Sequence, residues 1–216
     1  MCSGRVDLEF ILRAFSNGQD GVFIGGCKLD ECNYITHGNY DALSVTYLCK
    51  KIMEHIGLNP ERLRIQFMSG ADGNLLAEVA DDFTAKVKAL GPLGKGEGID
   101  LKGLKIKLEA VRKLVPYIRL VERERLRIPL KSKEAYHDFF TSDAFDRLFN
   151  ELIANKMAMS QIVLLLRERP LSTCNLSERL GLSPSEISRH MNVSSRHGFV
   201  RYDENRKCYA LAQADL

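Results

Sequence analysis

Three cysteines near the start of the chain, Cys2, Cys27 and Cys32, stand beside glycines and polar residues. Four residues separate Cys27 from Cys32 within the stretch GGCKLDECNY, and Cys2 opens the turn CSGR. No segment of the sequence resembles a secretory signal, so we expect a reducing, cytoplasmic compartment. Clustered thiols in such a compartment more often bind metal or do redox chemistry than form disulfides. The alternatives are three ordinary thiols or a zinc site without iron.

The elements that must position these thiols alternate between helix and strand. Hydrophobic periodicity predicts helix, strand, helix, strand and helix over residues 7–17, 21–27, 39–57, 63–69 and 72–90. Such alternation indicates an α/β fold with a small parallel sheet, which one more strand just before Cys2 would make more regular. Parallel strands end at the same edge of a sheet, so the Cys2 turn and the Cys27–Cys32 loop are expected to meet there. Backbone N–H groups of Gly4 and Gly26 could then hydrogen-bond the sulfurs of a cluster.

A [2Fe–2S] cluster normally takes four cysteine thiolates, and this chain offers three well-placed ones. Cys49 lies in the middle of a predicted helix and is interpreted as a core residue. Cys174 and Cys208 fall in the C-terminal region and are interpreted as structural. His37 is close in sequence but is expected to be a surface loop residue. The fourth ligand is therefore left open.

The C-terminal region has the pattern of a winged helix-turn-helix. A helix over 157–168 precedes Pro170, and a short helix with Asn175 as its cap ends at Gly181. The next helix starts with Ser183, Pro184 and Glu186, a capping box, and two strands follow it. Residues 157–212 resemble the winged helix of arsenic-sensor-type repressors.

This winged helix has two possible roles, DNA binding or protein docking. DNA binding would use an exposed helix face and a basic wing. The candidate residues are Ser185, Ser188, Arg189, Ser194, Ser195 and Arg196 in the helix, and Arg201, Arg206 and Lys207 in the wing. Because DNA-binding domains are usually distinctly basic, and residues 134–216 carry ten Lys/Arg against eleven Asp/Glu, the composition favours a docking or structural role.

Charge and composition divide the chain into three predicted parts. Residues 1–93 form the cysteine-loop domain, 94–133 a basic helical linker, and 134–216 a helical and winged-helix domain. The linker carries twelve Lys/Arg against five Asp/Glu. Those charges could dock against an acidic subunit surface or form a solvated helix face. No apolar run approaches the length of a membrane span, and no dinucleotide or phosphate-loop motif is present.

The first 93 residues resemble the iron–sulfur (delta) subunit of methyl-viologen-reducing hydrogenase. The resemblance rests on CSGR at 2–5, DGV at 20–22, the pairs Gly26-Cys27, Gly38-Asn39 and Glu61-Arg62, and Cys32 and Tyr34. It implies one [2Fe–2S] cluster held by Cys2, Cys27 and Cys32. It also implies transfer of electrons from a hydrogenase or formate dehydrogenase module to a heterodisulfide reductase A-like flavoprotein.

The resemblance leads us to expect a non-catalytic electron-transfer subunit. Two departures from the family bear on that expectation. The family's N-terminal strand, which carries its own cysteines, is missing before Met1, so we expect an N-terminally truncated reading of a longer protein. The winged helix is not part of the minimal family domain. It supports the alternative of an iron–sulfur redox-sensing transcription regulator, for which DNA would be the partner.

Overall fold

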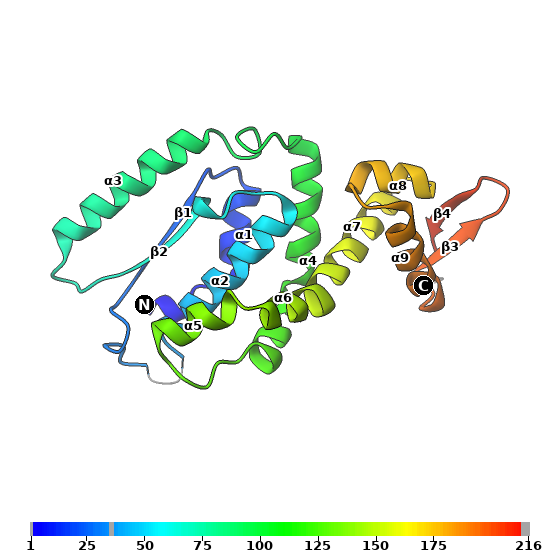
Figure 1. Cartoon of the computed structure of the whole chain (residues 1–216). Coiled ribbons are helices and arrows are strands. Elements are labelled where there is room, and N and C mark those ends of the chain that lie inside the picture. The colour runs from blue at the N-terminus through cyan, green and yellow to red at the C-terminus, as the bar shows by residue number, and fades with distance from the viewer. Residues whose placement is uncertain (1, 35–36, 213–216) are drawn as a thin grey trace. The chain divides into compact units, whose positions relative to one another are not determined.

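A computed structural model describes residues 2–34 and 37–212 of the chain. The chain divides into two compact units, Met1–Arg147 and Leu148–Leu216, which are described separately. The first contains a parallel pair of strands with helices around it, and the second contains helices followed by a β-hairpin (Figure 1). The predicted fold class, a small parallel-sheet domain followed by a winged helix-turn-helix, is confirmed. Within the described residues, no helix is both long and apolar enough to cross a bilayer.

The first unit follows the predicted alternation closely. Its elements are a 3₁₀ turn Ser3–Arg5, α1 Leu8–Ser16, β1 Val22–Gly26, α2 Asn39–Ile56, a 3₁₀ turn Pro60–Arg62, β2 Leu63–Phe67, α3 Gly73–Leu90, α4 Leu101–Arg125, α5 Lys133–Phe140 and most of α6 Asp143–Phe149, which ends in the second unit. Strands β1 and β2 pair in parallel, with Val22 opposite Leu63 and Gly26 opposite Phe67. Both strands therefore end at the same edge, where the cysteine loops lie.

The two faces of the strand pair are covered by different helices. Ile24 is buried, whereas the ring of its neighbour Phe23 packs on Phe83 of α3 with a centroid distance of 5.8 Å. Alternate strand residues point to opposite faces, so α3 covers one face. Figure 1 shows α3 and α4 on opposite sides of the strands. The predicted apolar face of α1 is buried in full, at Leu8, Ile11, Leu12 and Phe15.

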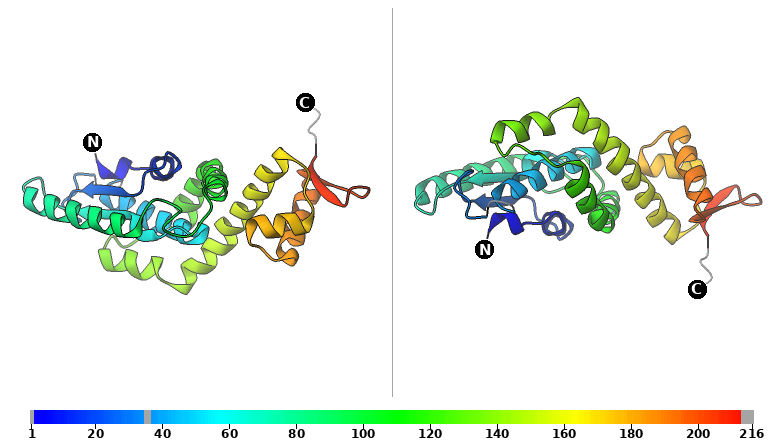
Figure 2. Two further views of the ribbon diagram at one scale, coloured as in Figure 1. Left: turned by 90° about the horizontal axis from the view of Figure 1, so that it is seen from above. Right: turned by 90° about the horizontal axis from the view of Figure 1, so that it is seen from below.

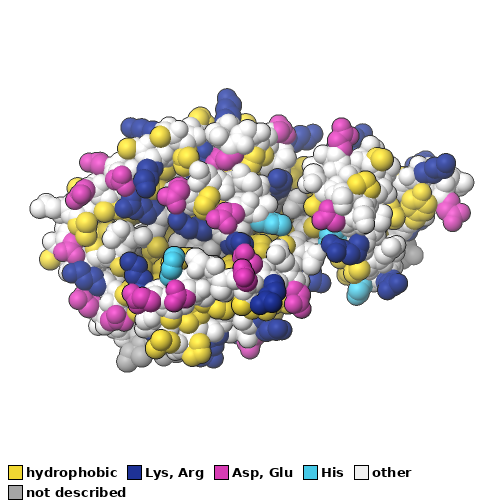
Figure 3. Space-filling model, in the orientation of Figure 1, with side chains coloured by type: hydrophobic (Ala, Val, Ile, Leu, Met, Phe, Trp, Pro, Cys, Tyr) yellow, Lys and Arg dark blue, Asp and Glu magenta, His cyan; other side chains and the backbone are white. Residues whose placement is uncertain are grey.

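The basic segment is largely the helix α4, which packs along α1. Arg112 donates two hydrogen bonds to Glu9, at 3.1 and 2.7 Å. Arg119 forms an ion pair with Asp7, the N-cap residue of α1. Part of the predicted cationic face is therefore used within this unit. On the face drawn in Figure 3, Lys and Arg side chains are interspersed with Asp and Glu.

The second unit contains the winged helix. Its elements are a π-helical segment Asn150–Ala154, α7 Asn155–Glu168, α8 Thr173–Leu180, α9 Pro184–Arg196, β3 Val200–Asp203 and β4 Cys208–Leu211. Figure 2 shows β3 and β4 as a hairpin that extends beyond α9. The capping box of Ser183 and Glu186 is confirmed. The predicted cap of α8 was wrong, because Ser172 rather than Asn175 caps it, by accepting the backbone N–H of Asn175.

Candidate metal centre

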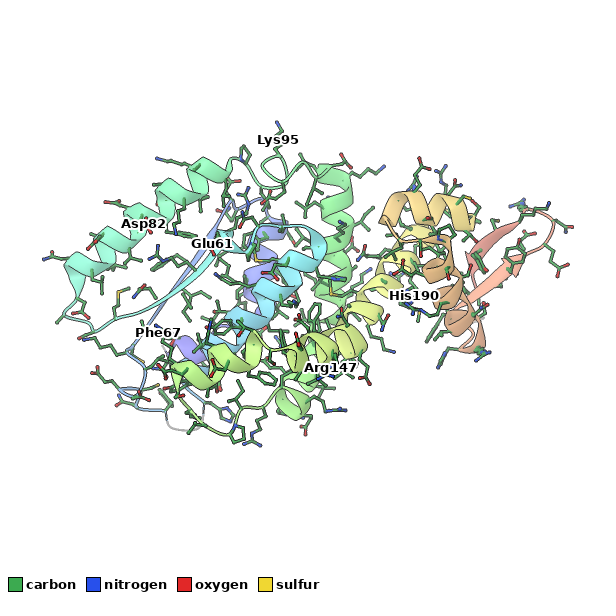
Figure 4. All side chains as sticks on the ribbon, in the orientation of Figure 1. Glu61, Phe67, Asp82, Lys95, Arg147 and His190 are labelled. Carbon is green, nitrogen blue, oxygen red and sulfur yellow. The ribbon has the colours of Figure 1, made fainter. Side chains whose placement is uncertain are left out.

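The cysteine loops lie where β1 and β2 end. Figure 4 labels Phe67, the last residue of β2, and Glu61, which lies just before the strand; the site lies at the Phe67 end. An open cleft of about 420 Å³ is found there. Its lining consists of Cys2, Ser3, Gly25, Gly26, Cys27, Met68, Ser69, Gly70, Asp72, Gly73 and Leu76. The two strands thus bring together segments from three separate parts of the chain.

Two of the three candidate thiols are in contact. The Sγ atoms of Cys2 and Cys32 are 3.9 Å apart, although thirty residues separate them in sequence. Two thiolates bound to one tetrahedral ion with bonds of roughly 2.3 Å would lie about 3.8 Å apart. The pair therefore has a spacing that suits shared metal ligation and is too long for a disulfide. Both side chains are partly accessible, and that of Cys27 is exposed.

Glycines at positions 4 and 38 allow this close approach. A Cβ atom on Gly4 would lie 2.4 Å from the carbonyl oxygen of Gly38, so the two backbones touch. A Cβ atom on Gly38 would lie 2.6 Å from the Sγ of Cys32. Because side chains at these positions would force the two loops apart, the glycines set the distance between Cys2 and Cys32. The Gly4 N–H also points to the Cys2 Sγ at 3.4 Å.

Backbone N–H groups of the Cys32 loop and of the N-terminus of α2 stabilise the thiolate of Cys32. Backbone N–H groups of Tyr34 and Asn39 donate hydrogen bonds to its sulfur and lower its pKa. Asn39 is the first residue of α2, where unpaired N–H groups favour negative charge. Partial loss of hydration, together with the neighbouring thiols of Cys32 and Cys2, raises the pKa of Cys27. Negative charge is therefore accommodated more readily at Cys32 than at Cys27.

Asn39 holds the Cys27 loop, a role that sequence reasoning missed. The cap of α2 is Gly38, whereas Asn39 is the first residue of the helix, and its side chain is buried and turned toward β1. Its amide donates to the carbonyl oxygens of Cys27 at 3.0 Å and of Lys28 at 2.7 Å. The same amide lies 3.5 Å from the Cys27 Sγ. The Gly38-Asn39 pair was the available signal for this role.

The donor set of this site consists of three thiols and one neighbouring hydroxyl. Within residues 2–34 and 37–212, no three His, Cys, Asp or Glu side chains are arranged as a ready metal site. The pair Cys2 and Cys32 has the required spacing, and Cys27 interacts electrostatically with both. One polar atom beside them, the hydroxyl of Ser3, is buried with no hydrogen-bond partner. The chemistry of three thiols and an unpaired hydroxyl fits a sulfur-rich cofactor.

The remaining cysteines are not part of this cluster of thiols. Cys49 is fully buried in α2, and burial raises its pKa to about 12, so its thiol stays protonated at neutral pH. Cys174 is exposed on α8 and Cys208 is buried in β4, both in the second unit. His37 is exposed and contacts Asp41 at 3.2 Å. His37 was expected at the surface, and it lies there.

In the second unit, the candidate nucleic-acid residues fall into two groups. Arg189 and Arg196 of α9 and Arg201 of β3 are exposed, and Ser188 is half-buried. Ser194 was predicted on the exposed face of α9, which is wrong. It is fully buried, and its hydroxyl contacts the sulfur of Met159 on α7. Ser194 therefore serves the packing of α9 on α7 rather than an outer surface.

Taken together, the fold and the site define a small α/β protein with a thiol-rich centre at the end of a parallel strand pair, in a chain that also carries a winged helix. Residues 1–91 match the family of the methyl-viologen-reducing hydrogenase delta subunit, and the chain belongs to this family. Residues 157–202 match the bacterial regulatory protein, arsR family.

Named relatives of the first region belong to hydrogenases and heterodisulfide reductases. The iron-sulfur subunit of the F420-non-reducing hydrogenase of Archaeoglobus profundus is 47% identical over 91 residues, which are 42% of this chain and 66% of the relative. The vhu iron-sulfur subunit of the F420-non-reducing hydrogenase of Methanococcus maripaludis is 42% identical over 91 residues, 42% of this chain and 67% of the relative.

A third relative is much longer than this chain. It is one of the subunits of the ferredoxin/F(420)H(2)-dependent CoB-CoM heterodisulfide reductase of Methanosarcina acetivorans, 43% identical over 94 residues. That stretch covers 44% of this chain and only 12% of the relative. The chain thus spans just under two thirds of the first relative's length and a small part of this one.

Proposed function

We propose that the chain is an electron-transfer subunit in which Cys2, Cys27 and Cys32 hold a [2Fe–2S] cluster. The observation that carries this proposal is the 3.9 Å contact between the Cys2 and Cys32 sulfurs at the edge where two parallel strands end. Membership of a family whose named relatives are iron-sulfur subunits supports the choice of iron. When bound, such a cluster takes up and releases single electrons.

The protein's own residues would bind the cluster and shape its surroundings. Gly4 and Gly38 keep the Cys2 and Cys32 loops in contact, and the Asn39 amide fixes the Cys27 loop. The N-terminus of α2 favours the thiolate of Cys32. We propose Gly4 and Gly26 as cofactor-binding positions, since Gly26 directly precedes Cys27 and the Gly4 N–H already points to a cysteine sulfur. The fourth ligand is left unassigned.

For partners, we propose a hydrogenase or formate dehydrogenase module as donor and a heterodisulfide reductase A-like flavoprotein as acceptor, in the cytoplasm. The relatives' names support this choice, because one group belongs to hydrogenases and another to heterodisulfide reductases. The exposed position of Cys27 is compatible with transfer across a subunit surface. No acid–base machinery is required of the chain in this role.

The test begins with the full chain, purified without oxygen after cluster reconstitution. Iron and acid-labile sulfide are measured, and the reduced protein is examined by electron paramagnetic resonance. We expect about two irons and two sulfides per chain, with strong losses in Cys2→Ala, Cys27→Ala and Cys32→Ala. The control is Cys174→Ser, an exposed cysteine of the second unit, which should retain the wild-type content. A chain without iron and sulfide would overturn the proposal.

A second candidate is a redox-sensing transcription regulator. It is favoured by the arsR-family match and by the exposed cations Arg189, Arg196 and Arg201 around α9. The second unit carries nine Lys/Arg and seven Asp/Glu, which is a weak positive excess for a DNA-binding domain. Gel-shift assays on the genomic DNA upstream of the gene decide between the roles. Binding that is sequence-specific and depends on cluster state supports the regulator, and weak salt-sensitive binding does not.

A further inference from the structure

The hydroxyl of Ser3 is an unpaired polar group at the thiol site. Among the residues that the structure describes, its Oγ is the one buried side-chain nitrogen or oxygen that lacks a hydrogen-bond partner. Leaving a buried hydroxyl unpaired is costly, and native proteins rarely do so without a reason. The hydroxyl is therefore expected to have a partner that is not one of the described protein groups.

This hydroxyl lies beside two of the candidate ligands, Cys2 and Cys27. Ser3 follows Cys2 directly in the chain and begins the 3₁₀ turn Ser3–Arg5. In space, its Oγ approaches the other cysteine loop, since a Cβ atom on Gly26 would lie 3.0 Å from it. Gly26 directly precedes Cys27, and Cys2, Ser3, Gly26 and Cys27 all line the same cleft. A group held by Cys2 and Cys27 would be next to this hydroxyl.

We propose that Ser3 is a positioning residue of the metal centre, whose hydroxyl donates a hydrogen bond to a sulfur of the bound cluster. The inference rests on the proposed function and adds a determinant of the cluster's redox potential. Hydrogen bonds to cluster sulfurs stabilise the more negative, reduced state and so raise the potential. A hydroxyl is suited to this task because it can rotate toward a sulfur acceptor.

The test compares Ser3→Ala with Ser69→Ala in the full chain with its cluster. Ser69 lines the same cleft, but its hydroxyl already accepts a hydrogen bond from the Ala71 N–H at 3.3 Å, so it is a matched control. The readout is the midpoint potential from a redox titration followed by electron paramagnetic resonance. At a fixed applied potential, we expect the ratio of reduced to oxidised cluster to be about tenfold lower in Ser3→Ala. For one electron, this corresponds to a midpoint potential about 59 mV lower than that of the wild type. Ser69→Ala should match the wild type.

A second measurement separates this role from a structural one. In the cluster-free chain, Ser3→Ala removes an unpaired buried hydroxyl, so its melting temperature should equal or exceed that of the wild type. A lower melting temperature would mean that Ser3 supports the fold, which overturns the inference. If the fold is intact and the variant fails to retain iron, the lost contact to the cluster is the cause and the inference stands.

The failures of the two proposals are distinguishable. A wild-type chain that binds no iron or sulfide overturns the proposed function. A wild-type chain with its cluster, together with a Ser3→Ala variant of unchanged potential, leaves the proposed function in place and overturns the role of Ser3. Equal shifts in Ser3→Ala and Ser69→Ala would also overturn it, because any change in the cleft would then have the same effect.

Discussion

Replacing Gly38 by alanine should displace Cys32 from the thiol site, because the added methyl group would clash with its surroundings. The added Cβ atom would lie 2.4 Å from the carbonyl oxygen of Tyr34 and 2.6 Å from the Sγ of Cys32. Real Cβ contacts are essentially never shorter than 3.0 Å, so these atoms must withdraw by at least 0.6 and 0.4 Å. The backbone oxygen of Tyr34 cannot rotate away as a flexible side chain could. The loop that carries Cys32 must therefore move.

The magnitude follows from what overpacking costs in a tight site. Such insertions destabilise proteins by about 1–3 kcal/mol. For a protein of this length, that corresponds to a melting temperature lower by about 2–12 °C. The movement also separates Cys32 from Cys2, and disturbance of a metal centre's supporting groups typically weakens metal retention by about 10–100-fold. We expect Gly38→Ala to show both effects.

The assay measures melting temperature by circular dichroism and iron retention during titration with a chelator. Gly25→Ala is the matched control, because Gly25 lines the same cleft and its Cβ would meet nothing within 4 Å. It should keep the stability and iron content of the wild type. If Gly38→Ala matched Gly25→Ala in both measurements, the close approach of the two loops would not be what sets the thiol spacing.

Three further predictions concern titratable or buried polar groups of the first unit. Burial raises the pKa of Glu122 to about 6, so the free energy of unfolding falls by up to ~2 kcal/mol as the pH rises from 4.5 through 6. Glu122→Gln should flatten this pH dependence in urea unfolding and add stability at pH 7.5. An unchanged pH dependence would contradict this reasoning. Glu97→Ala leaves the fully buried Arg62 guanidinium without its carboxylate partner, so the free energy of unfolding in urea should fall by about 3–5 kcal/mol. A fall of less than about 1 kcal/mol would refute the reasoning. Asn39→Ala leaves the Cys27 and Lys28 carbonyls without their amide donor, so the free energy of unfolding should fall by about 1–3 kcal/mol. The variant should also retain iron less well than Cys174→Ser in a chelator assay.

Local patterns predicted most of the fold because they depend on neighbours in sequence. The buried face of α1 and the capping box of α9 follow from spacings of three and four residues, and both are present. The capping of α8 was misplaced because Ser172 and Asn175 are both good cap residues, and composition alone does not rank them. Ser194 was assigned to an exposed face because a serine near the end of a polar helix gives no sign of what packs on it.

Long-range partners could not be predicted from the sequence. Arg62 lies in the polar run NPER, which reads as a surface turn, yet it is fully buried and paired with Glu97, thirty-five residues away. Asn39 reads as an ordinary helix cap, yet its amide holds the Cys27 loop. The unpaired hydroxyl of Ser3 becomes visible only when the whole surroundings of the atom are known. Such partners depend on the packing of separate segments, which a local pattern does not record.

The basic segment links these points to the thiol site. Its positive charge left open whether it docks on an acidic partner or faces solvent, and the structure adds a third use. Arg119 pairs with Asp7, which also accepts the Glu9 N–H and so begins α1. Asp7 lies two residues after the Ser3–Arg5 turn, and Cys2 is the cap residue of that turn. The ion pair is partly exposed and contributes little energy by itself, but it occupies one of the cations of the basic segment within the first unit. The net charge of residues 94–133 is therefore weak evidence for an acidic partner surface, since part of that charge is paired with Asp7 and Glu9 of the first unit.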